Sequence, residues 1–146
     1  MVTMELDEVL HLVSIMFDSV ARNNYVHNQN IGIGINGESY SNKIYNNIIS
    51  DSKYAGIDTS EKSSNNKIYN NTITDSPNGI VVKTGASENI FHDNKILNVT
   101  ENGIVHFKEN SYTKTKTDGN KFENNRVMKS KVNANNSASL VVNDVN

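Results

Sequence analysis

A short pattern of alternating apolar and polar residues recurs along the chain at a nearly constant interval. Its clearest copy is Asn-Lys-Ile-Tyr-Asn-Asn-Ile-Ile at 42–49, with related segments at 66–73, 89–96 and 120–127 and a degenerate copy at 19–26. A second marker, Gly followed by Ile, keeps the same period of 23 or 24 residues and starts at Gly32, Gly56, Gly79 and Gly103. Because two markers share one period, the chain contains an internal repeat.

Each repeat unit predicts short strands joined by turns. Runs of three to five residues alternate between apolar and polar, and Gly, Asn, Asp and Ser separate them. A unit of this length without helical periodicity cannot bury its own apolar face, so successive units must stack as parallel strands about 4.8 Å apart. The sequence therefore predicts an all-β fold, a single-stranded parallel β-helix of about five coils of 23–24 residues.

The two ends depart from the repeat. Apolar residues with helical spacing follow Thr3, at Leu6, Val9, Leu10, Val13 and Phe17. We predict a capping helix over residues 1–14 and the β-helix over residues 15–146. Residues 15–17 could instead form a strand of an incomplete coil, and both features can coexist. The period later lengthens by about eight residues, which predicts a polar loop insertion at about 108–119, and residues 140–142 predict a last strand.

Asparagine is the unusual feature of the composition, with 26 of 146 residues. Disorder does not explain it, because the net charge is only −2, there is one proline and Ile and Val are plentiful. One Asn occupies the same corner of every copy, at Asn24, Asn47, Asn71, Asn94 and Asn125. Asn tolerates left-handed turns, and an inward amide can bond to the next coil, so we predict a structural Asn ladder. A polar ligand-binding stripe is the alternative.

Several function classes are disfavoured by composition. The absence of Cys removes disulfides, thiolate metal sites and cysteine nucleophiles. With a pI of about 6.1 the chain has no excess of positive charge to attract nucleic acid, so no nucleic-acid partner is expected. No stretch approaches the roughly 20 apolar residues of a membrane span, so no membrane partner is expected either. No signal peptide is visible, which leaves the localisation unknown. No metal-binding motif occurs and the four His do not converge, so we expect no metal and no cofactor.

Candidate chemistry lies in an outward row and in one mixed cluster. The outward row comprises Arg22, Tyr45, Tyr69, His92 and Glu123, and we predict that it contacts an extended polysaccharide by stacking on sugar faces and bonding to hydroxyls. The alternative is a Tyr ladder that stabilises strand pairing. His106, Lys108 and Tyr112 combine a base, a cation and a phenol, the groups needed to remove the C5 proton of a uronate. By alternation, however, His106 points inward.

The segment Met-Phe-Asp-Ser-Val-Ala-Arg-Asn-Asn-Tyr-Val-His-Asn at 16–28, with the repeats that follow it, resembles the later coils of mannuronan C5-epimerase-like right-handed parallel β-helix proteins. Similar repeats occur in carbohydrate-binding and sugar-hydrolase β-helices and in NosD-type periplasmic proteins. The resemblance covers about residues 16–127 and implies a right-handed coil, an alginate-type substrate and an extracellular or periplasmic location. The Asp-Pro-His signature of the epimerases is absent, since the only proline is Pro77, so no catalytic residue is carried over.

These observations favour a polysaccharide-facing module that binds a uronate-type glycan without turning it over. The alternatives are an active polyuronate C5-epimerase or lyase, and a structural surface β-helix with no ligand. Open ends of a coil stack also predict self-association.

Overall fold

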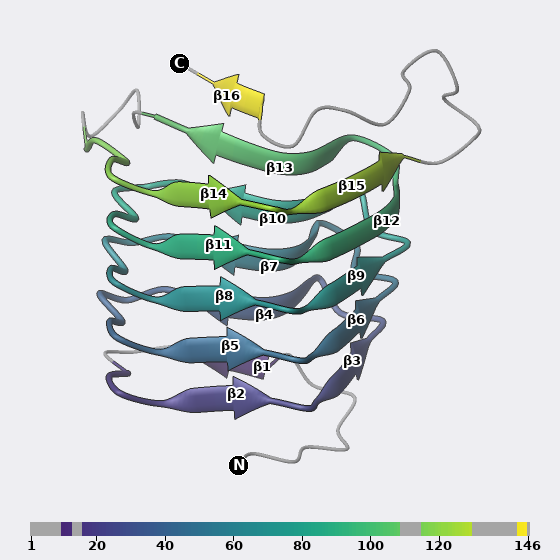
Figure 1. Ribbon diagram of the computed structural model, residues 1–146, viewed down its shortest axis with the longest axis horizontal. Helices are drawn as coiled ribbons and strands as arrows, with labels where there is room; N and C mark the ends of the chain where they lie inside the picture. The colour runs from purple at the N-terminus through teal and green to yellow at the C-terminus, as the bar shows by residue number, and fades with distance from the viewer. Residues whose placement is uncertain (1–9, 13–15, 109–114, 130–142, 146) are drawn as a thin grey trace.

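A computed structural model describes residues 10–12, 16–108, 115–129 and 143–145 of the chain (Figure 1). This part of the chain folds into three parallel sheets, and it contains no helix. Sheet I consists of β1 (Leu10–Leu12), β4 (Ile31–Ile35), β7 (Ala55–Thr59), β10 (Asn78–Val82), β13 (Asn102–Phe107) and β16 (Asn143–Val145). Sheet II consists of β2 (Val20–Arg22), β5 (Lys43–Tyr45), β8 (Lys67–Tyr69), β11 (Ile90–His92) and β14 (Lys121–Glu123). Sheet III consists of β3 (Tyr25–His27), β6 (Ile48–Ser50), β9 (Thr72–Thr74), β12 (Lys95–Val99) and β15 (Arg126–Lys129).

Each turn of the chain visits sheets II, III and I in that order, which confirms the predicted parallel β-helix. The strands of sheet II begin at residues 20, 43, 67, 90 and 121, so successive turns take 23, 24, 23 and 31 residues. The five sequence copies therefore enclose about four complete turns. The longer last turn reflects the segment between β13 and β14, of which residues 109–114 lie outside the described part.

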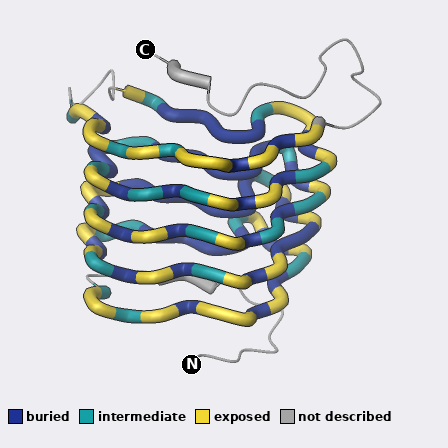
Figure 2. The backbone as a smooth tube through the Cα atoms, viewed as in Figure 1, coloured by how far each residue is buried: buried dark blue, intermediate teal, exposed yellow. Residues whose placement is uncertain are grey.

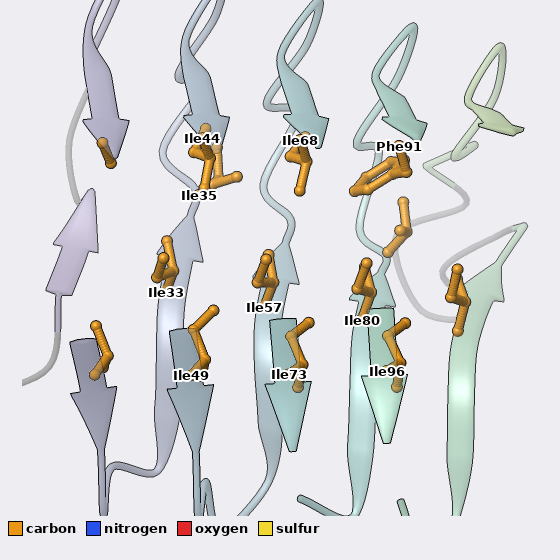
Figure 3. Close-up of a cluster of buried hydrophobic side chains, with 14 of the residues drawn as sticks. Ile33, Ile35, Ile44, Ile49, Ile57, Ile68, Ile73, Ile80, Phe91 and Ile96 are labelled. Carbon is orange, nitrogen blue, oxygen red and sulfur yellow. The ribbon is translucent and has the colours of Figure 1, made fainter. Parts of the chain in front are cut away.

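The interior consists of stacked apolar side chains, at least one from each strand of a complete turn. Figure 3 shows three such columns, which run through Ile44 and Ile68, through Ile49 and Ile73, and through Ile33 and Ile57. All are fully buried, whereas exposed residues alternate with buried ones along the strands (Figure 2). Burial of one such side chain stabilises the fold by about 1.5–3 kcal/mol, so these columns are the main source of stability.

The glycine of each Gly-Ile pair is needed because the interior is narrow at that corner. A Cβ at Gly56 would collide with Ile73 of the following turn, and one at Gly79 would collide with Ile96 and with the backbone oxygen of Gly103, both also in the following turn. No larger residue fits without moving the backbone, which explains why the second sequence marker keeps the period.

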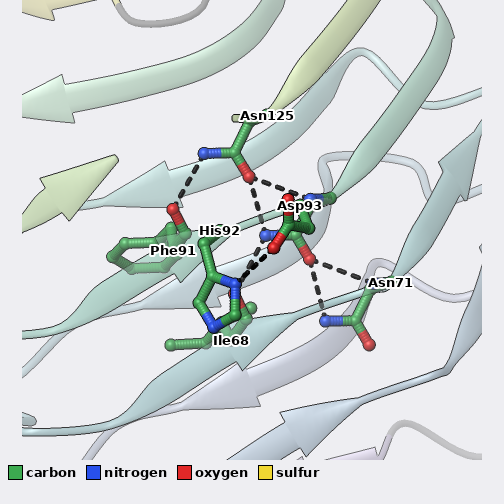
Figure 4. A network of polar contacts seen from close by, with 7 residues as sticks. Ile68, Asn71, Phe91, His92, Asp93 and Asn125 are labelled. Carbon is green, nitrogen blue, oxygen red and sulfur yellow. Dashed lines mark hydrogen bonds and ion pairs between the residues drawn. The ribbon is translucent and has the colours of Figure 1, made fainter. Parts of the chain in front are cut away.

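Two Asn ladders run through the corners, of which the sequence predicted one. In the predicted ladder, the backbone N–H and the Nδ2 of Asn71 both donate to Oδ1 of Asn94, at 3.1 and 3.0 Å, and Asn94 repeats this with Asn125 (Figure 4). The second ladder consists of Asn42, Asn66, Asn89 and Asn120. The left-handed backbone belongs to the residue before the ladder Asn, such as Asn70 at φ 53°, so the ladder Asn itself does not supply the turn as predicted.

The predicted N-terminal helix is wrong for Leu10–Leu12, which form β1. The other residues of the range 1–14 lie outside the described part. Leu10 and Leu12 also satisfy the two-residue period of a strand, and pairing with β4 supplies their backbone hydrogen bonds. The alternative strand at 15–17 is represented by Phe17, which forms a parallel bridge with Tyr40. The last strand is β16 at Asn143–Val145, three residues after its predicted position.

Candidate functional site

The candidate site is the outer surface of sheet II and the adjoining edge of sheet III. Sheet II faces the viewer in Figure 1, with sheet I behind it. In each strand of sheet II the middle residue points into the core and the flanking residues point outward, as in β5 and β8. We call this surface the basic face. It comprises the two outward columns of sheet II, which are Val20, Lys43, Lys67, Ile90 and Lys121, and Arg22, Tyr45, Tyr69, His92 and Glu123. It also includes the corner column Asn23, Asn46, Asn70, Asp93 and Asn124, and the first outward column of sheet III, which is Tyr25, Ile48, Thr72, Lys95 and Arg126.

The predicted row lies along the middle of the basic face, with its aromatic rings aligned. Tyr45 and Tyr69 are register partners whose ring centroids are 4.9 Å apart with planes inclined by 7°. Tyr69 and His92 stack in the same way, at 4.9 Å and 2°. Both faces of the Tyr69 ring are therefore covered by its neighbours. A sugar cannot stack on the Tyr69 ring, as the sequence predicted for the row, without separating these rings.

The two ends of the row are polar. Arg22 lies over the Tyr45 ring, with its guanidinium carbon 6.0 Å from the centroid, and its Nη1 donates to the Tyr45 hydroxyl at 3.2 Å. At the other end His92 Nδ1 lies 2.7 Å from Asp93 Oδ2, and Glu123 is the register partner of His92 (Figure 4). Each phenol oxygen can accept one hydrogen bond and donate another, so the row presents directional groups at the spacing of the coils.

Positive charge is concentrated on this face. Its exposed cations are Arg22, Lys43, Lys67, Lys95, Lys121 and Arg126. Only two carboxylates share the face, those of Asp93 and Glu123, so its formal charge is +4 with histidine neutral, whereas the whole chain carries −2.

None of the six cations forms an ion pair with a residue that the structure describes. Lys43 and Lys67 are direct register partners, as are Lys95 and Arg126. Like charges directly opposed on neighbouring strands are destabilising, so the face carries an electrostatic penalty that the fold does not require.

The predicted catalytic cluster is not assembled on the surface by the described residues. His106 is 8% exposed and points inward, as the alternation predicted, with its ring 5.5 Å from that of Phe122 and its Nε2 3.4 Å from Nδ2 of Asn120. Lys108 is exposed after the end of β13, and Tyr112 lies outside the described residues.

A polar cluster that the sequence did not reveal lies on the outer surface of sheet I. Lys83 Nζ lies 2.7 Å from Asp58 Oδ2, 3.4 Å from the Tyr54 hydroxyl and 4.9 Å from the centroid of that ring. Burial lowers the pKa of Lys83, but the hydrogen bonds and charges of Asp58 and Tyr54 outweigh it and raise that pKa above 10.5. The sequence does contain a signal for this ion pair. Asp58 and Lys83 are separated by one period plus two residues, which places them diagonally on adjacent coils.

Within the described ranges, no three His, Asp or Glu side chains converge as they would around a metal ion. The same ranges contain no helix that is long and apolar enough to cross a membrane.

Comparison with known proteins supports the fold. No curated protein and no solved structure matches the chain significantly. The model of one family, described as the right handed beta helix region, matches residues 13–145, which is nearly the whole chain. With three parallel sheets visited in a fixed order and this match over its length, the chain belongs to the right handed β-helix region family.

Proposed function

We propose that the protein binds a linear polyanionic glycan, of the uronate type, along the basic face and does not turn it over. The observation that carries this proposal is the set of six exposed cations in and beside an aligned row of phenol and imidazole groups, none of which forms an ion pair with a described residue. A carboxylate on each sugar would neutralise the cation columns, and sugar hydroxyls would bond to the phenol oxygens.

The repeat of the face supports an extended ligand. Neighbouring rings in the row are separated by 4.9 Å, so a polymer with a similar repeat meets equivalent groups on successive coils. Contact through ring edges and hydroxyls replaces the face stacking that the sequence suggested. The resemblance to mannuronan C5-epimerase-like coils agrees with a polyuronate ligand.

Turnover is not supported by the described residues. A catalytic base must reach the proton that it removes, and the His106 ring is packed against Phe122 in the interior. The sequence also lacks the Asp-Pro-His signature of the epimerases. The remaining alternative is a ligand-free structural β-helix, in which the Tyr row only stabilises strand pairing.

Titration of oligouronates, followed by Tyr fluorescence and calorimetry, tests the proposal. We expect saturable binding that weakens as salt is raised, because the cations are exposed. Removal of two charges in Lys43→Gln/Lys67→Gln should weaken binding by about tenfold, at roughly 0.5–1 kcal/mol for each exposed contact.

The matched control is Lys53→Gln/Lys62→Gln, which removes two exposed lysines from outside the face. It should bind like the unmodified chain, and a neutral oligosaccharide of equal length should not bind. Absence of saturable binding, or equal loss in the control variant, would contradict the proposal.

A further inference from the structure

Three Asn-Gly pairs occur in the chain, and the structure places them in two different settings. They are Asn36-Gly37, Asn78-Gly79 and Asn102-Gly103. In such a pair the backbone nitrogen of Gly can attack the side-chain amide of Asn, because Gly has no side chain that shields this nitrogen. The first pair lies in the turn after β4, whereas the other two lie within β10 and β13. The same reactive dipeptide is therefore present once in a turn and twice in sheet I.

The two pairs inside sheet I are held in place by hydrogen bonds and packing. Asn78 is buried, and its Nδ2 donates to Oε2 of Glu101 at 3.0 Å. Its Oδ1 accepts a hydrogen bond from Nδ2 of Asn102 at 2.9 Å. Even a Cβ added at Gly103 would collide with Val127, so the backbone there has no room to rearrange. Reaction of either pair would require the strand to leave the sheet.

The peptide bond between Asn36 and Gly37 is polarised from both sides. The Gly37 N–H donates to Oε2 of Glu61 at 3.1 Å, so a carboxylate base contacts the proton that must be removed. The carbonyl oxygen of Asn36 accepts hydrogen bonds from the hydroxyl and the backbone N–H of Ser39, at 2.6 and 3.3 Å. Donors to this oxygen stabilise the negative charge that spreads over the peptide group when its nitrogen loses the proton. These contacts make the Gly37 nitrogen a better nucleophile than an ordinary backbone amide.

The side chain of Asn36 is not anchored as that of Asn78 is. Its Oδ1 is buried and accepts no hydrogen bond, so rotation of the amide toward the Gly37 nitrogen breaks no bond to this oxygen. The residue as a whole is half-buried, which leaves water access to the turn.

We propose that Asn36 is a self-modification site, at which Asn36 and Gly37 form a succinimide that opens to aspartate or isoaspartate. Glu61 takes the proton from the Gly37 nitrogen, and the electron pair of this nitrogen forms a bond to Cγ of Asn36. The Cγ–Nδ2 bond then breaks, and Nδ2 leaves with that proton as ammonia. Water, the only co-reactant, adds to either carbonyl carbon of the succinimide and breaks the bond from that carbon to the ring nitrogen.

The modification changes the corner that joins sheet I to sheet II. Either product adds a carboxylate close to Glu61, and isoaspartate also adds one methylene group to the backbone. The Glu38 N–H in this turn donates to the Glu61 carbonyl of the next coil at 2.8 Å. The added charge and length disturb this contact between two coils, so modified molecules should unfold at a lower urea concentration than unmodified ones.

Tandem mass spectrometry of the full chain during incubation at neutral pH tests the proposal. The exchange of NH for O should appear at Asn36, with isoaspartate in the same peptide, while Asn78 and Asn102 stay unmodified in the folded chain. In urea all three pairs should react at similar rates, so the difference between the two conditions measures the effect of the fold. Hydroxylamine, which cleaves the chain at a succinimide, should cut the folded chain at residues 36–37 and leave the other two pairs intact.

Two exposed carboxylates of this corner supply a variant and its matched control. Glu61→Gln removes the base but keeps an oxygen that can accept the Gly37 N–H, so the reaction should slow by at least about tenfold. Glu38→Gln removes the neighbouring carboxylate and should leave the rate unchanged. In urea both variants should react like the unmodified chain.

Three outcomes overturn the proposal. The first is equal reaction at all three pairs in the folded chain. The second is a Glu61→Gln variant that reacts as fast as the unmodified chain or faster, because the carboxylate then protects the peptide nitrogen instead of activating it. The third is aspartate without isoaspartate at position 36, since a succinimide opens at both of its carbonyl carbons.

Discussion

The inner Asn ladder and the outer basic face share one period, yet they differ in how well their polar groups are satisfied. Inside, Asn71 accepts two hydrogen bonds from Asn47 and donates to Asn94 and to the Ile44 carbonyl. Outside, Lys43 and Lys67 face each other without a described anion between them. Regular spacing alone is thus no sign of function. Polar groups that the fold leaves uncompensated are the better indicator of a ligand.

The largest effect should come from breaking the ladder. Asn71→Leu removes the acceptor of the Asn47 backbone N–H and the Nδ2 donor to the Ile44 carbonyl. It also removes one of the two hydrogen bonds of Asn47 Nδ2, which keeps its bond to the Ala21 carbonyl. With about 1–3 kcal/mol for each unsatisfied buried group, we expect a loss of about 3–5 kcal/mol, or no folding at all. Urea unfolding measures this loss. Asn30→Leu, at an exposed position, should change the unfolding free energy by less than about 0.5 kcal/mol. Similar losses of unfolding free energy in both variants would show that the ladder amides contribute no more to stability than an exposed Asn does.

An intermediate effect is expected at the ion pair on sheet I. Lys83→Met leaves the Asp58 carboxylate, which is 5% exposed, without its cation. Breaking a buried pair costs about 3–5 kcal/mol, but Lys83 is about one-third exposed, so we expect about 2–3 kcal/mol. The double variant Asp58→Asn/Lys83→Met should recover most of this loss, because it removes the stranded charge.

The same pair makes stability depend on alkaline pH. Because the folded pKa of Lys83 is raised above 10.5, its contribution is complete below that pH and is lost as the pH rises through the raised value. Unfolding free energies between pH 8 and pH 11.5, compared with those of Lys83→Met, measure this loss. A constant difference between the two proteins across that range would contradict the assigned cause.

Much of the fold could be predicted because the repeat constrains it. The period, the inward Ile columns, the Asn24 to Asn125 ladder and the inward His106 all follow from alternation within one 23–24-residue unit. The second ladder was equally visible, since Asn42 is the first residue of the same motif. It was missed because a residue at the edge of a strand gives no alternation signal.

Other features depend on contacts between coils, which the sequence does not display. Leu10–Leu12 fit a helix and a strand equally well by pattern, and pairing with β4 decides between them. The charge of the basic face was hidden by a chain total of −2, because carboxylates lie mainly at other positions. The stacked geometry of Tyr45 and Tyr69 also could not be foreseen, since spacing gives no ring orientation.

The smallest effect on stability should come from the basic face itself, and its sign is the informative part. Lys67→Glu places an anion directly beside Lys43 and two residues before Tyr69, so a repulsive pair becomes an attractive one. We expect the unfolding free energy to rise by about 0.2–1 kcal/mol, while oligouronate binding falls by at least about tenfold. Urea unfolding and calorimetry on one preparation measure both. If the unmodified chain proves more stable than Lys67→Glu, the basic face carries no electrostatic penalty, and its charges do not indicate a ligand. A gain in stability together with a loss of binding is the result expected if Lys67 binds a ligand and also destabilises the fold.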